Sequence, residues 1–97
     1  MNELEVQYNN FLETRFPRLK NLDSPEDICL ISLDSNTAGC ISSFITLGKL
    51  NDKKTYILKD CYQDLCTVSL SLEKAEKAYF TQLRDLAELT LKAIGHQ

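Results

Sequence analysis

The sequence predicts an all-α protein, a small helical bundle that ends in an antiparallel pair of helices. Apolar residues recur at the three- and four-residue spacing of an amphipathic helix along most of the chain. The two longest such stretches, residues 52–70 and 73–94, are separated by only a short connection, which is typical of antiparallel neighbours. The length of 97 residues predicts a single domain that covers residues 1–97.

The N-terminal segment, residues 3–16, is predicted to form the first helix. Its apolar residues at helical spacing, continued by one leucine beyond it, are Leu4, Tyr8, Phe11, Leu12, Phe16 and Leu19. Pro17 disfavours a helical conformation at the residue before it, so the helix is expected to end there. A second helix start is predicted at Ser24-Pro25, because serine caps free N–H groups and proline fits the first helical position.

Residues 28–33 are short and almost wholly apolar, and this pattern fits a buried helical turn or a buried strand equally well. The polar cluster at residues 34–37 contains four residue types that favour helix starts. It predicts a helix over residues 36–47. Gly48 is expected to end that helix in the left-handed conformation.

An α+β fold with a short central β-hairpin is the alternative to the all-α bundle. In that arrangement residues 44–47 and 55–58 would pair around a polar turn at residues 51–52. Residues 28–33 would add a third strand. The long helical stripe that begins at Leu58 favours the all-α fold.

The C-terminal half contains the clearest helices. Residues 52–70 carry an apolar stripe with helical periodicity, and residues 73–94 are rich in good helix formers. An acidic and a basic residue at Glu73 and Lys77 have the spacing of a stabilising pair. We expect the two helices to form an antiparallel hairpin that turns at residues 71–73.

The charge balance excludes several classes of partner. The formal net charge is −3, whereas nucleic-acid binders and proteins of anionic membrane surfaces usually present basic patches. One basic stretch, with Arg15, Arg18 and Lys20, is interpreted as a solvated helix end. No apolar run approaches the about 20 residues of a membrane span, and residues 1–10 lack the features of a secretory signal. We therefore expect a small acidic cytoplasmic protein that binds neither nucleic acid nor membrane.

The four cysteines are scattered rather than paired in Cys-x-x-Cys motifs. Cys29, Cys40, Cys61 and Cys66 each lie in an apolar stretch, so buried reduced thiols are expected. The last two are five residues apart, which on a helix separates their directions by about 140° and prevents them from sharing a metal ion. A thiol or metal sensor that uses these cysteines is the alternative function.

No catalytic, cofactor or metal site is predicted, and the protein is not expected to be an enzyme. The only histidine, His96, lies next to the end of the chain, where a general base would not be held near its proton donor. Asp60 and Asp64 share one helix face, which we interpret as solvated. Three glycines are too few for a phosphate-binding loop.

The remaining hypothesis is a non-enzymatic protein–protein interaction or regulatory module. The chain carries extensive apolar stripes for its length, and surplus apolar surface marks interaction sites. The partner would be another protein or a second copy of this one, as in a homodimer. The candidate interface residues are Tyr62, Tyr79, Leu83, Leu86 and Leu89. The three leucines span more than one helix face, so part of them is expected to stay exposed on a monomer.

Overall fold

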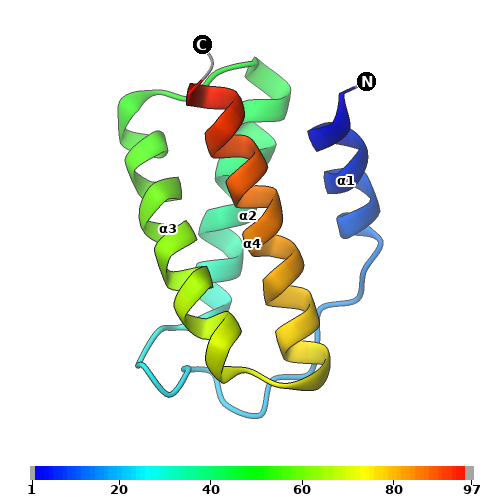
Figure 1. The fold of residues 1–97 in the computed structure, drawn as a ribbon, viewed down its shortest axis with the longest axis vertical. Coiled ribbons are helices and arrows are strands. Elements are labelled where there is room, and N and C mark those ends of the chain that lie inside the picture. Colours follow the sequence, from blue (N-terminus) through cyan, green and yellow to red (C-terminus); the bar gives the residue numbers. More distant parts are fainter. Residues whose placement is uncertain (1, 96–97) are drawn as a thin grey trace.

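Four α-helices make up most of the computed structural model, which describes residues 2–95. In chain order they are α1 Glu3–Leu12, α2 Leu30–Leu47, α3 Asp52–Ser71 and α4 Lys74–Gly95. Successive helices from α2 to α4 run in opposite directions, and the short α1 lies beside α4 (Figure 1). Within the described residues the only β-type pairing is an isolated bridge between Asp23 and Cys29, so the all-α prediction is confirmed and the α+β alternative is not.

Helices α3 and α4 form an antiparallel hairpin, as predicted, and α4 contacts all three other helices. The turn consists of Leu72 and Glu73, within the expected residues. Leu58 and Leu65 of α3 and Leu83 of α4 are completely enclosed. Burial of one such leucine contributes about 1.5–3 kcal/mol, so contacts of this kind hold the two helices together. None of the helices described between residues 2 and 95 is long and apolar enough to cross a membrane.

Helix α2 begins earlier than predicted, at Leu30 instead of residue 36. The first turns bury Leu30 and Leu33, which leave only 1% and 4% of their surfaces exposed. The polar cluster that was expected to cap the helix lies inside it, and the Thr37 hydroxyl donates to the Leu33 carbonyl at 2.7 Å. Burial of the apolar residues outweighs the capping preference. Gly48 ends α2 with a φ of 75°, as predicted.

The connection from α1 to α2, residues 13–29, differs most from the prediction. Helix α1 ends at Leu12, short of the predicted residue 16, and its last turn closes with a bond from the Thr14 N–H to the Phe11 carbonyl. The predicted helix start at Ser24 is wrong. The Ser24 hydroxyl accepts hydrogen bonds from the backbone N–H groups of Glu26 and Ile28 and stabilises a turn instead. The ambiguous segment 28–33 is helical only from residue 30.

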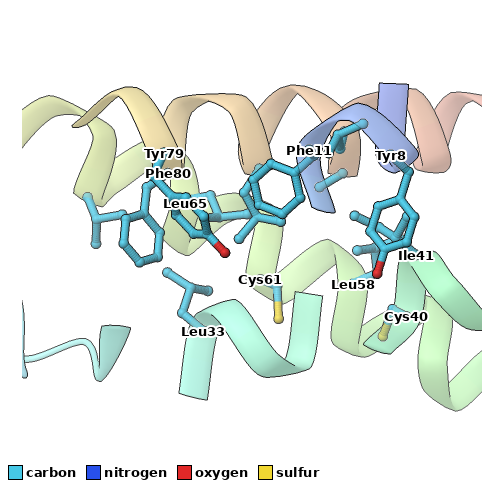
Figure 2. Close-up of a cluster of buried hydrophobic side chains, with 14 of the residues drawn as sticks. Tyr8, Phe11, Leu33, Cys40, Ile41, Leu58, Cys61, Leu65, Tyr79 and Phe80 are labelled. Carbon is cyan, nitrogen blue, oxygen red and sulfur yellow. The ribbon is translucent and has the colours of Figure 1, made fainter. Parts of the chain in front are cut away.

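Aromatic side chains join α1 to the rest of the bundle. The rings of Phe11 and Tyr79 lie 4.9 Å apart, and those of Tyr79 and Phe80 lie 5.3 Å apart. The Tyr79 hydroxyl donates to an Asp34 carboxylate oxygen at 2.7 Å. Figure 2 shows these rings in one buried layer with leucines from α2 and α3. Tyr79 therefore connects α1, α2 and α4.

Candidate interaction groove

A groove of about 410 Å³ lies between the start of the α1–α2 connection and the first turns of α4. We call it the Phe16 groove. Its lining residues are Thr14, Arg15, Phe16, Pro17, Arg18, Ala75, Ala78, Tyr79 and Gln82. The two sides of the groove are distant in sequence, and the fold brings them together because α1 packs along α4.

One stripe of α4 forms the floor of the groove. Ala75, Ala78 and Gln82 follow one another at spacings of three and four residues, which places them on the same helix face. The two alanines are exposed and small. They leave space where a longer side chain would otherwise cover the helix.

Phe16 forms the wall and keeps 39% of its surface exposed. Its ring meets the ring of Tyr79 edge-on at 5.1 Å and that of Phe80 at 6.3 Å. Aromatic pairs of this geometry contribute about 0.5–1.5 kcal/mol beyond their buried area. The buried core thus holds Phe16 in place while part of its ring stays accessible.

The rim of the groove is basic although the chain is acidic. Arg15 and Arg18 are both exposed, and neither forms an ion pair with any carboxylate of residues 2–95. Because no aspartate or glutamate lines the groove, the two arginines give it a local charge of +2. The sequence interpretation of this stretch as a helix end is wrong, since α1 ends at Leu12.

Tyr79 serves the groove as an apolar surface rather than as a titrating group. Only 8% of the residue is exposed. Burial raises the pKa of its hydroxyl above the usual value, and the hydrogen bond to Asp34 raises it further. Tyr79 is therefore neutral at physiological pH, with its hydroxyl committed to α2.

A second hollow of about 460 Å³ lies where the end of the connection and the start of α2 meet α3. We call it the Cys29 groove. Its lining residues are Asp27, Ile28, Cys29, Ser32, Leu33, Asn36, Tyr56, Ile57, Asp60, Cys61 and Asp64. Three carboxylates and no lysine or arginine line it, so its charge is opposite to that of the Phe16 groove.

The four cysteines are free and differ in exposure. The predicted burial is confirmed for Cys40 and Cys61, where burial raises the pKa of each thiol. Cys66 is partly buried, and the prediction is wrong for Cys29, which is exposed at the start of α2. A hydrogen bond from the Ser32 hydroxyl lowers the pKa of the Cys29 thiol, as does the Ser32 backbone N–H.

Asp60 and Asp64 lie on one face of α3, as predicted, and both line the Cys29 groove. Burial raises the pKa of Asp64, and the neighbouring Asp60 carboxylate raises it further. Nowhere between residues 2 and 95 do three histidine, cysteine or acidic side chains gather into a metal-binding cluster. His96 lies outside the described residues.

The structure does not gather the five predicted interface residues on one surface. Tyr79, Leu83 and Leu86 belong to the core, with at most 8% of each residue exposed. Tyr62 and Leu89 are partly buried at the surface.

Tyr62 belongs to α3 and Leu89 belongs to α4. The pKa of Tyr62 is raised by a hydrogen bond with the Cys66 thiol and is also influenced by Glu88 and Arg84 of α4. Leu89 follows Arg84 by five residues, which turns it about 140° away around the helix. Leu89 therefore lies on a different face of α4 from Arg84.

The residues of the Phe16 groove were not recognised as a site in the sequence. One signal was available, because Phe16 precedes a proline and is flanked closely by Arg15 and Arg18. The exposed alanines of α4 carried no signal, because alanine is ordinary in a helix. No protein-family model, curated protein sequence or solved structure matches this chain, so the chemistry of its surfaces alone indicates a function.

Proposed function

We propose that this protein is a non-enzymatic interaction module that binds another protein through the Phe16 groove. The observation that carries this function is the partly exposed Phe16, which lines the groove together with two exposed alanines and two arginines that form no ion pair within residues 2–95. Aromatic residues and arginine are enriched where protein interfaces derive most of their affinity. A pre-formed, partly apolar surface also requires little ordering on binding.

A different protein fits the groove better than a second copy of this chain. A two-fold dimer built on the Phe16 groove would bring together the same surface from both copies. It would bring four arginines, Arg15 and Arg18 of each copy, into one interface. Four like charges at such an interface oppose association.

We place the module in the cytoplasm. Four free cysteines support this location, because thiols persist where glutathione and thioredoxin keep them reduced. The groove offers two cations, which is few for a nucleic-acid backbone. These features support a protein as the partner.

A thiol-sensing role is the second candidate, and the lowered pKa of the exposed Cys29 favours it. The buried Cys40 and Cys61 provide no accessible second thiol. A lone exposed thiol defines no sensing pair, so protein binding is the better supported function.

Site-specific photo-crosslinking in the source cells tests the proposed function. The photoreactive amino acid p-benzoyl-phenylalanine replaces Gln82 in the groove or, as a matched control, the exposed Gln63 on α3. We expect a discrete heterologous adduct from position 82 that is missing from position 63. The same adducts from both positions, or none from position 82, would refute protein binding at this groove. An adduct of twice the chain mass would assign the surface to self-association instead.

A further inference from the structure

We infer that the Phe16 groove selects an acidic segment of its partner, in which carboxylates adjoin a large apolar side chain. This inference rests on the proposed function and specifies the partner's chemistry. It follows from the charge of the rim, the shape of the floor and the absence of any competing carboxylate among the lining residues.

Arg15 and Arg18 lie on either side of Phe16 and Pro17 in the connection. A guanidinium presents several N–H donors in a planar fork that matches a carboxylate, and the paired form is stronger than a neutral hydrogen bond. Neither arginine forms an ion pair within residues 2–95. The nearby Glu76 carboxylate instead accepts the backbone N–H of Lys20 at 3.4 Å. Arg18 also lines a neighbouring hollow with Glu73 and Glu76, but it forms no ion pair with either, so both guanidinium groups are available to carboxylates of a partner.

The groove beside the arginines accommodates an apolar group. Phe16 and Tyr79 provide two aromatic surfaces, and Ala78 leaves the space beside them open. The cavity of about 410 Å³ falls in the size range of sites that enclose small ligands. A leucine or phenylalanine side chain inserted there would exchange water for aromatic and methyl contacts.

The acidic net charge of the chain does not oppose this selection at physiological ionic strength. Charges separated by more than about 8 Å are then largely screened. The local charge of +2 at the groove therefore acts more strongly on a docked segment than the net charge of −3 spread over the whole chain.

Fluorescence anisotropy with three labelled peptides tests the inference. The probes are Glu-Glu-Leu-Phe-Glu-Glu, the same peptide with glutamine at all four acidic positions, and the same peptide with lysine there. We expect the acidic peptide to bind about fivefold more tightly than the glutamine peptide, from two partly exposed charge pairs. The lysine peptide is expected to bind most weakly. Raising the salt from roughly 50 to 500 mM should remove most of the difference.

Charge-matched variants test whether the preference for the acidic peptide arises at the Phe16 groove. R15Q/R18Q is expected to bind the acidic and glutamine peptides equally, whereas K53Q/K59Q loses the same charge on exposed positions of α3 and should keep the preference. A78R fills the floor while adding a cation, so it should weaken binding of all three peptides. Tighter binding of the acidic peptide by A78R would show attraction without insertion and would overturn the inferred apolar anchor.

The remaining outcomes separate this inference from the proposed function. Equal affinity of the acidic and glutamine peptides, or no binding of any peptide at millimolar concentration, overturns the inference. The crosslink at position 82 would still support a protein partner. Binding to phosphatidylserine vesicles that depends on Arg15 and Arg18, without peptide binding, would assign the groove to a membrane surface and also overturn the inference.

Discussion

The Phe16 groove and the Cys29 groove are formed by the two ends of the same connection, residues 13–29, and they are similar in size but opposite in charge. The first is lined by two arginines and no carboxylate, and the second by three aspartates and no basic residue. A net charge of −3 describes neither surface. The comparison shows that local charge, and not net charge, should be used to exclude classes of partner, because net charge governs only the average field of a protein.

The two grooves also differ in what supports them. Phe16 packs edge-on against Tyr79 and Phe80, so the buried core fixes the wall of its groove. The Cys29 groove instead presents a thiol at a helix start and carboxylates on α3. Both grooves have apolar lining residues, but only the first adds arginine, a residue type enriched where interfaces derive most of their binding energy.

The largest expected effect is the difference in lost stability between a variant of the core residue Phe80 and a variant of Phe16, the wall of the groove. Phe80 is fully buried, so F80A should lower the free energy of unfolding by about 3–5 kcal/mol. Phe16 keeps 39% of its surface exposed, and F16A should cost only about 1 kcal/mol. Urea unfolding measures both. Equal losses would show that Phe16 is a core residue and is not available to a partner.

The exposed thiol of Cys29 and the buried thiols should differ strongly in reactivity. At pH 7 iodoacetamide is expected to label Cys29 about 100-fold faster than Cys40 or Cys61, because the buried thiols react only when the structure opens. S32A should slow labelling of Cys29, since the Ser32 hydroxyl lowers its pKa. Mass spectrometry of peptides after timed labelling gives the rates. Comparable labelling of Cys61 would mean that the Cys29 groove opens to solvent.

The long helices could be predicted because local pattern and tertiary packing agree there. Helix α4 was expected at residues 73–94 and is found at Lys74–Gly95. Its helix-forming residues and its apolar stripe favour the same conformation. Helix α3 matches its predicted range equally well, with Asn51 as its side-chain cap.

The start of α2 could not be predicted because local and tertiary preferences conflict. Ser24 and the polar cluster at residues 34–37 both favour a helix start, but α2 begins at Leu30 after Cys29, a residue type that is not among those preferred at helix starts. Burial of Leu30 and Leu33 decides the boundary. The extent of that burial depends on where α3 and α4 pack, and this information is not local.

The Phe16 groove was beyond prediction for a related reason. Its wall and floor come from residues near 16 and near 78, and nothing in either segment indicates that they meet. The sequence showed the arginines, but it was interpreted as placing them at a helix end, whereas α1 ends at Leu12. On a helix they would be ordinary solvated charges. On an irregular segment beside an aromatic ring they form the rim of a groove.

A smaller effect is expected from Tyr79, which lines the Phe16 groove, at alkaline pH. The pKa of Tyr79 is raised, so the folded protein keeps this proton while the unfolded chain loses it above pH about 10. Stability is fully present below that pH and falls above it, by up to about 1.4 kcal/mol per pH unit for one tyrosine.

Y79F tests this assignment. At pH 7 it should cost about 1–2 kcal/mol, because the hydrogen bond to Asp34 is lost. Between pH 10 and 11, which is about the range where tyrosine titrates, its stability should fall less steeply than that of the wild type. Denaturant unfolding across this range measures both quantities. Parallel curves would mean that another group, such as Tyr8, whose pKa burial also raises, causes the alkaline loss.

The smallest effect contrasts the charges of the two grooves. The pKa of Asp64 is raised by burial and by Asp60, so ionisation of this carboxyl destabilises the fold above pH about 4. D64N should therefore stabilise the protein at pH 7 by up to about 0.5 kcal/mol, and the gain should disappear near pH 3. R15Q should leave stability unchanged at both pH values, because Arg15 forms no ion pair within the described residues. Thermal unfolding measures both variants. If D64N destabilises the protein, the Asp64 carboxylate accepts a stabilising hydrogen bond, and the negative charge of the Cys29 groove contributes to the stability of the fold.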